Sequence, residues 1–289
     1  MYPASFDYLR PGSLDEALSL LTQHGDDAKL LAGGHSLVPA MKLRLIQPKY
    51  LIDIGRVPDM RGIQVGGQEV VIGAMTIHAD VADSADVEQH LPGLADAARR
   101  VGDVQVRNRG TIGGSVAHAD PAADFPVILT ALNASFSLVS PVGSRTVGVE
   151  DFFVDFFTTA LEPNEVLTEI RVPIPGVGSG NAYAKFPHPA SGYVVVSAGA
   201  VIGRDSSGNC TSARVAIGGL GGKPLRASAT EAALTGQPLN AENIAAAAAK
   251  AAEGGDPEGD LYASAEYKAH VATVYAREAV QTAVQRAGG

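Results

Sequence analysis

Two short glycine-containing segments carry the residues best suited to binding an anion. The first reads Ala32-Gly33-Gly34-His35-Ser36 and the second reads Thr111-Ile112-Gly113-Gly114-Ser115. A Gly-Gly step lets the backbone approach a ligand closely, and its N–H groups, with a neighbouring hydroxyl, can surround a phosphate oxygen. Each segment alone is also compatible with an ordinary turn. As a pair, they predict that the two phosphates of a dinucleotide are held from opposite sides.

The composition narrows the classes of function. A chain of 289 residues with 46% apolar and 18% charged residues predicts a folded protein of two or three domains. Its net charge of −9 argues against nucleic-acid binding, which needs concentrated Lys and Arg. The single cysteine, Cys210, cannot supply a thiolate-held zinc or iron–sulfur site, and no metal site is predicted. If the chain carries electrons, its carrier is organic.

The hydropathy of the chain predicts its cellular compartment. No apolar run is long enough to cross a bilayer, and the first residues lack a basic stretch followed by an apolar one. We therefore expect a cytoplasmic protein without a transmembrane segment.

The elements that position the first glycine segment are predicted within residues 1–56. A capping box, Ser13 to Glu16, begins a helix with an apolar face at helical spacing, and Gly25 ends it. Strands are expected at 29–32 and 50–54. This region therefore reads as a β-α-β unit that delivers the first segment directly after a strand.

The second segment lies within a region predicted at 57–175. Strands are expected at 70–72 and 166–172, with a basic loop at 106–110. Asp120-Pro121 predicts the N-cap and first residue of a helix that continues to Leu132. A bend rich in Gly and Pro then leads to a third region, 176–289, with two strands followed by three helices. The whole chain is predicted to have an α+β fold.

Two stretches of sequence carry a family resemblance. AGGHSLVPAMKLRL (32–45) and RNRGTIGGSVAHADPAADFP (107–126) resemble the FAD-binding medium subunits of the molybdenum hydroxylases. The first stretch is most similar to the form found in aerobic carbon monoxide dehydrogenases. The resemblance covers essentially the whole chain. It implies a two-subdomain FAD-binding fold of the p-cresol methylhydroxylase and vanillyl-alcohol oxidase type, followed by a C-terminal α+β domain of the CO dehydrogenase flavoprotein type.

The resemblance also implies the residues that contact FAD, which would be bound non-covalently with its diphosphate gripped by both glycine segments. These residues are Leu30, Leu31, Ala32, Gly33, Gly34, His35, Ser36, Leu37, Thr111, Ile112, Gly113, Gly114, Ser115, Asp124, Leu167, Lys185 and Tyr193. No residue of the chain is predicted to be catalytic.

Several of these residues have a second interpretation. Asp124 would otherwise favour the first turn of its helix, Lys185 would be a solvated strand lysine, and Tyr193 would be a half-buried strand tyrosine. A histidine at the position of His35 is linked covalently to flavin in another branch of the superfamily, whereas the medium-subunit resemblance implies that it shapes the turn. Structural or surface roles are expected for the histidines that show no metal-ligand spacing, which are His78, His118 and His188.

The family relationship implies a function in electron transfer. In this family a large molybdopterin subunit oxidises the substrate, a small subunit carries [2Fe–2S] clusters, and the medium subunit carries FAD. We therefore expect the chain to pass electrons from the clusters to an acceptor such as a quinone, within a dimer of heterotrimers that is at most peripheral to the inner face of the membrane. CO is the expected substrate of the complex; a xanthine dehydrogenase-type, N-heterocycle or aldehyde hydroxylase is the alternative. A self-contained flavin oxidase and a scaffold that has lost its cofactor are two further interpretations.

Overall fold

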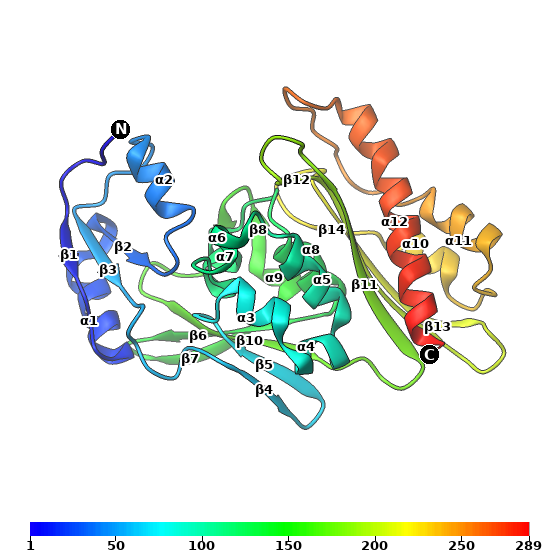
Figure 1. The fold of residues 1–289 in the computed structure, drawn as a ribbon, viewed down its shortest axis with the longest axis horizontal. Helices are drawn as coiled ribbons and strands as arrows, with labels where there is room; N and C mark the ends of the chain where they lie inside the picture. The colour runs from blue at the N-terminus through cyan, green and yellow to red at the C-terminus, as the bar shows by residue number, and fades with distance from the viewer. Residues whose placement is uncertain (289) are drawn as a thin grey trace.

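The computed structural model describes residues 1–288, which form three main sheets that follow one another along the chain (Figure 1). The N-terminal sheet is parallel, with the order β1-β3-β2. Its strands are β1 (Asp7–Leu9), β2 (Ala28–Leu31) and β3 (Tyr50–Asp53). The carboxyl ends of parallel strands meet at one edge of a sheet, where ligands of α/β sheets commonly bind. Strand β2 therefore delivers the first glycine segment to this edge.

Helix α1 (Leu14–His24) connects β1 to β2 and begins at the predicted capping box. The Ser13 hydroxyl oxygen accepts a hydrogen bond from the N–H of Glu16 at 3.1 Å. The Glu16 carboxylate accepts from the N–H of Gly12 at 2.7 Å. Ala17, Leu18 and Leu21 are buried on the inner face, and Gly25 ends the helix with a φ of 50°. The predicted helix is confirmed at both ends.

The second sheet is antiparallel and has the order β4-β5-β10-β6-β7. Its strands are β4 (Ile63–Gly66), β5 (Glu69–Gly73), β6 (Ser135–Ser140), β7 (Gly143–Gly148) and β10 (Val166–Pro173). Seven helices and a small hairpin accompany it: α3 (His78–Asp83), α4 (Ala85–His90), α5 (Pro92–Arg100), α6 (Val104–Arg107), α7 (Ile112–His118), α8 (Phe125–Ala131), α9 (Val149–Phe152), β8 (Phe153–Asp155) and β9 (Thr158–Thr159). One hydrophobic core joins this unit to the N-terminal one.

The third sheet is also antiparallel, with the order β11-β12-β13-β14. Its elements are β11 (Ser179–Pro187), β12 (Val194–Arg204), β13 (Cys210–Gly218), β14 (Leu225–Arg226), α10 (Ser228–Leu234), α11 (Ala241–Ala248) and α12 (Ala265–Ala287). Helix α12 packs on one face, and α5 and α8 pack on the other (Figure 1). Because both faces are covered, β12 is buried along most of its length. None of the helices within residues 1–288, α12 included, is long and apolar enough to span a membrane.

The expectation of only two strands in the third region is wrong, because β11 precedes them and pairs with β12 along its length. Strand β11 contains Gly180, Asn181 and two alanines, and none of the β-branched residues that indicate a strand. Neighbouring helices select these small residues. A Cβ on Gly180 would lie 2.1 Å from the carbonyl oxygen of Ala283 in α12. Tertiary packing, rather than intrinsic propensity, specifies this strand.

Two expectations around the second glycine segment are also corrected. Helix α8 begins at Phe125 with Asp124 as its N-cap, because the Asp120 carboxylate closes a separate turn by accepting from the N–H of Ala122 at 2.9 Å. The predicted basic loop is partly helical, since α6 extends to Arg107 after Asp103 caps it by accepting from the N–H of Val106 at 2.9 Å. Helix α8 is therefore shorter than the sequence suggested, and the basic loop is more helical.

Candidate cofactor site

The two glycine segments lie against each other, although about 80 residues of chain separate them. A Cβ on Gly33 would lie 2.2 Å from the carbonyl oxygen of Arg109 and 2.7 Å from the Cα of Gly110. A Cβ on Gly114 would lie 3.7 Å from the Cβ of Ala32. The absence of a side chain at Gly33 is therefore what lets the first segment approach the main chain that leads into the second.

The first segment presents free backbone donors. Within residues 1–288, the N–H groups of the four consecutive residues Gly33 to Ser36 donate to no acceptor. Gly34 has a φ of 76°, a conformation that glycine adopts readily, and Nδ1 of His35 lies 3.2 Å from the carbonyl oxygen of Gly33. Successive N–H groups in such a turn form a concave surface that binds anions.

The second segment is the start of helix α7, and its N–H groups are already used. The Thr111 hydroxyl caps the helix by accepting from the N–H of Gly114 at 3.1 Å. The N–H groups of Ile112, Gly113 and Ser115 donate to the carbonyl oxygens of Thr76, Ala74 and Thr111. The expectation that both segments offer bare N–H groups therefore holds for the first segment and is corrected for residues 112–115. A Cβ on Gly113 would lie 2.4 Å from the Cβ of Ala74, so the missing side chain lets the start of α7 pack closely on Ala74.

Asp124 at the start of α8 and Lys185 in β11 form a buried ion pair. The Lys185 ammonium lies 2.8 Å from Oδ1 of Asp124 and also donates to the carbonyl oxygen of Arg100 at 3.0 Å. The Tyr183 hydroxyl donates to Oδ1 of Asp124 at 2.9 Å. Tyr183 and Lys185 reach the same carboxylate because residues two apart in a strand point to the same face. The alternative of a solvated strand lysine is excluded for Lys185, which is 4% exposed.

Burial is the largest influence on the pKa values of Asp124 and Tyr183. It raises the pKa of the Asp124 carboxyl above its ordinary value, while the Lys185 ammonium and the Tyr183 hydroxyl oppose that rise. Burial, followed by the charge of Asp124, raises the pKa of Tyr183 well above its ordinary value. At neutral pH the tyrosine is therefore a hydrogen-bond donor toward the carboxylate. Tyr183 was not singled out from the sequence; its spacing of two residues from Lys185 on a strand was the available signal.

Tyr193 and Leu167 are two further side chains, outside the glycine segments, that are predicted to contact FAD. The Tyr193 side chain is 48% exposed, and its neighbour Val194 donates through its N–H to the carbonyl oxygen of Ala122 at 3.0 Å. Partial burial, followed by the charges of Asp120 and Asp124, raises the pKa of Tyr193. Leu167 is 6% exposed within the core beside a bulge of β10. Both side chains remain predicted FAD contacts.

His78, expected to be a structural or surface residue, is buried at the start of α3. Its Nδ1 has no hydrogen-bond partner within residues 1–288. Burial, followed by the charges of His35 and Arg107, lowers the pKa of His78 from 6.5 to about 4. The imidazole is therefore neutral at pH 7.

We expect His78 to make the free energy of unfolding depend on pH. Between its folded pKa of about 4 and its unfolded pKa of 6.5, the unfolded chain binds more protons, so stability decreases as the pH falls. Lowering the pH from about 7.5 to about 5.8 should cost the wild-type chain about 1 kcal/mol more than it costs a His78→Phe variant. Urea unfolding of both proteins at the two pH values measures the difference. Identical pH dependences would contradict the neutral, buried state of this imidazole.

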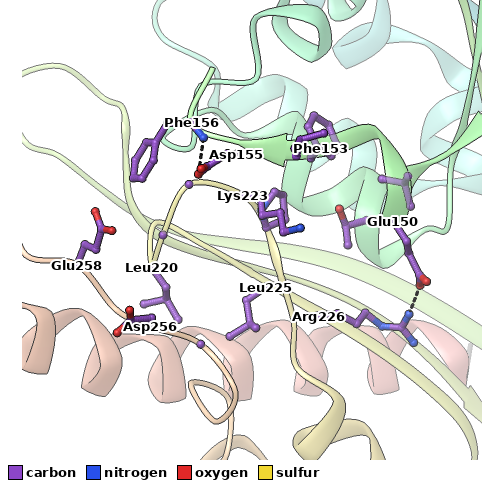
Figure 2. A pocket seen from close by; sticks show the side chains of 17 residues that line it. Glu150, Phe153, Asp155, Phe156, Leu220, Lys223, Leu225, Arg226, Asp256 and Glu258 are labelled. Carbon is purple, nitrogen blue, oxygen red and sulfur yellow. Dashed lines mark hydrogen bonds and ion pairs between the residues drawn. The ribbon is translucent and has the colours of Figure 1, made fainter. Parts of the chain in front are cut away.

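A cavity of about 590 Å³ lies elsewhere, between residues 149–156, the glycine-rich connection 220–226 and the loop 255–258 (Figure 2). Arg226 pairs with Glu150 at its edge, and the Asp155 carboxylate accepts from the N–H of Phe156 (Figure 2). None of the residues predicted to contact FAD lines this cavity. It is therefore a separate feature from the glycine segments.

Two known family profiles match this chain. The sequence profile of the FAD-binding domain in molybdopterin dehydrogenase matches residues 4–175, and that of the CO dehydrogenase flavoprotein C-terminal domain matches residues 181–283. The chain belongs to the FAD-binding subunits of the molybdopterin dehydrogenases. FAD is its cofactor, and the resemblance noted in the sequence is confirmed.

Relatives of these FAD-binding subunits match along their whole length. The chain is 43% identical to the carbon monoxide dehydrogenase medium chain of Hydrogenophaga pseudoflava, with 99% of each chain covered. It is 39% identical to the 6-hydroxypseudooxynicotine dehydrogenase complex subunit alpha of Paenarthrobacter nicotinovorans, with 99% of this chain and 97% of that one covered. A solved carbon monoxide dehydrogenase from Hydrogenophaga pseudoflava matches with a TM-score of 0.95, 45% identity and 99% coverage of both chains.

The glycine segments fit the cofactor of the FAD-binding subunits. A diphosphate needs several hydrogen-bond donors within a few residues and room for its oxygens near the main chain. The free N–H groups from Gly33 to Ser36 supply the donors, and the missing side chain at Gly33 keeps the main chain at Arg109 and Gly110 close.

Proposed function

We propose that this chain relays electrons as the medium subunit of a molybdenum hydroxylase of the carbon monoxide dehydrogenase type. The observation that carries the proposal is the run of four free N–H groups, Gly33 to Ser36, packed against the main chain at Arg109 and Gly110. A diphosphate there would accept hydrogen bonds from donors that have no partner within residues 1–288. When bound, FAD supplies the capacity to accept electrons singly and to release them in pairs.

The residues of the chain would hold and orient the cofactor. Leu30 to Leu37 would contact the diphosphate through the main chain, and Thr111 to Ser115 would close the opposite side. Asp124 and Lys185 would place a fixed, buried charge pair near the flavin ring, with Tyr193 beside the ring. Lys185 and Tyr183 hold the Asp124 carboxylate in one position. The direction in which its charge acts on the flavin ring would therefore be fixed before the cofactor binds.

The proposal extends to partners and location. A large molybdopterin subunit would oxidise the substrate, and a small [2Fe–2S] subunit would deliver electrons to this chain, in a dimer of heterotrimers. A quinone would then take the electrons, at a cytoplasmic site peripheral to the membrane. The three sheets support domain boundaries at 56/57 and 175/176. Because the related proteins are named as chains or subunits of larger enzymes, a self-contained flavin oxidase is disfavoured.

A second candidate function is the same electron relay in a hydroxylase of an N-heterocycle. The similarity to a subunit of the 6-hydroxypseudooxynicotine dehydrogenase complex, 39% identical over 99% of this chain, supports it. The two functions differ only in the substrate of the large subunit.

Purification of the tagged chain with its natural partners tests both candidates. We expect large and small subunits to co-purify with molybdenum, iron and FAD, and we expect CO to drive dye reduction by the complex. Reduction by heterocycles but not by CO would select the second function. A chain that purifies alone and oxidises a substrate through its own flavin would contradict both.

A further inference from the structure

His78 supports the main chain that leads into the second glycine segment. Its N–H donates to the carbonyl oxygen of Gly110 at 2.9 Å, and the N–H of Ile112 donates to the carbonyl oxygen of Thr76 at 3.0 Å. Between these two hydrogen bonds, Ile77 and Thr111 form an isolated antiparallel bridge. The start of α3 is therefore fixed to the residues immediately before α7.

The His78 side chain continues this support. A Cβ on Gly110 would lie 2.6 Å from Nε2 of His78, so the imidazole lies directly against the bare Cα of Gly110. Gly33 also packs on Gly110, because its own Cβ would lie 2.7 Å from that Cα. Gly110 is therefore in contact with the first glycine segment and with His78. The imidazole also packs on Phe125, with 5.1 Å between the ring centroids.

An imidazole at position 78 lowers the free energy of unfolding relative to an apolar side chain, so folding by itself does not explain why a histidine stands there. Nδ1 of His78 is buried without a partner within residues 1–288, and an unpaired buried polar group destabilises a fold by about 1–3 kcal/mol. An apolar side chain of similar size would avoid that cost. The ring also contacts a neighbour in sequence of each of two predicted site residues: Gly110 comes directly before Thr111, and Phe125 comes directly after Asp124.

We propose that His78 is a positioning residue for the FAD diphosphate. Its imidazole fixes the main chain at Gly110 and, through Gly110, the spacing between the two glycine segments. The side chain acts through Gly110 rather than by touching the cofactor. This inference rests on the proposed FAD site.

A double-mutant cycle between His78 and Gly110 tests the proposal. Gly110→Ala places a methyl group against the imidazole and should weaken FAD binding to the full-length chain about tenfold. His78→Ala removes the support and should also weaken FAD binding about tenfold. The double variant should bind FAD no more weakly than His78→Ala alone, because the overlap with the ring has gone. Fluorescence titration of the apo chain with FAD gives the dissociation constants.

Spectroscopy and a second pair of variants complete the test. The ³¹P resonances of bound FAD should shift in His78→Ala, whereas the thermal unfolding midpoint of the apo chain reports any general loss of structure. If His78→Ala does not fold, His78→Gln and His78→Phe are compared in the Gly110→Ala background. The flexible glutamine should restore FAD affinity and the phenyl ring should not.

The proposal is overturned if the effects of Gly110→Ala and His78→Ala on FAD affinity simply add, or if the ³¹P resonances do not move. It is also overturned if glutamine and phenylalanine at position 78 behave alike in the Gly110→Ala background. If Gly33→Ala loses FAD while the effects of Gly110→Ala and His78→Ala on FAD affinity simply add, only the role proposed for His78 is contradicted. Retention of FAD in Gly33→Ala would sink the proposed site itself.

Discussion

Gly33→Ala is expected to weaken FAD binding by about 100-fold or more, because the new methyl group cannot be accommodated without moving main chain. The Cβ would lie 2.2 Å from the carbonyl oxygen of Arg109, and the two glycine segments would have to separate. The φ of Gly33 is not positive, so alanine can adopt its backbone conformation. The loss would therefore arise from the contact between the segments. Titration of the apo chain with FAD, followed by fluorescence, measures it.

Gly66→Ala is the matched control for this variant. Gly66 also has a backbone conformation open to alanine, but nothing lies within 4 Å of the position of its Cβ. We expect Gly66→Ala to bind FAD as the wild type does. An affinity within about threefold of wild type for Gly33→Ala, or an equal loss in both variants, would refute the role of the contact.

Lys185→Met is expected to lower the free energy of unfolding by about 3–5 kcal/mol, because it leaves the Asp124 carboxylate buried without its counter-charge. The Lys185 and Asp124 side chains are 2% and 6% exposed, and the atoms of the pair are 2.8 Å apart. Burial already raises the pKa of Asp124, and removal of the ammonium removes the largest opposing influence. Urea unfolding of the apo chain measures the loss.

Lys49→Met is the matched control, because it removes a lysine–aspartate pair with the same distance between its charged atoms. Lys49 also pairs with an aspartate, Asp27, at 2.8 Å, but the two side chains are 71% and 50% exposed. Solvent screens such pairs, so we expect a much smaller loss of stability than in Lys185→Met. Similar losses in the two methionine variants would show that burial does not govern the Asp124–Lys185 pair. In the double variant Asp124→Asn, Lys185→Met, part of the lost stability should return, since the unpaired charge is gone.

The local features of the fold could be predicted from the sequence. The capping residues from Ser13 to Glu16 and the stop at Gly25 depend only on neighbouring side chains, and helix α1 begins and ends as they indicate. The glycine pair indicated a shared site because both segments have the same unusual composition. The family placement followed from the same two stretches. What these features have in common is that a few consecutive residues determine each of them.

The features that escaped prediction depend on contacts between distant parts of the chain. Strand β11 contains small residues because α12 lies against it, and nothing in its own sequence reports that helix. The partners of the Asp124 carboxylate lie about 60 residues further along the chain. His78 is an isolated histidine in the sequence, and only the folded chain brings its imidazole against Gly110 and Phe125.

The start of helix α8 shows a different limit. Asp120-Pro121 and Asp124-Phe125-Pro126 both place an aspartate before a proline, and both patterns are used. The first closes a turn at Ala122, and the second occupies the N-cap position of α8 without a side-chain capping hydrogen bond. The sequence around each aspartate indicates that the chain changes direction there. Which of the two aspartates precedes α8 depends on the packing of Phe125, which is fully buried in the core.

A structure of the full-length chain saturated with FAD tests the central claim most directly. We predict density for the diphosphate between Gly33–Ser36 and Thr111–Ser115, with its oxygens within hydrogen-bond distance of the free N–H groups of the first segment. Density for the diphosphate in the 590 Å³ cavity beside Glu150 and Arg226, with the glycine segments empty, would contradict the account.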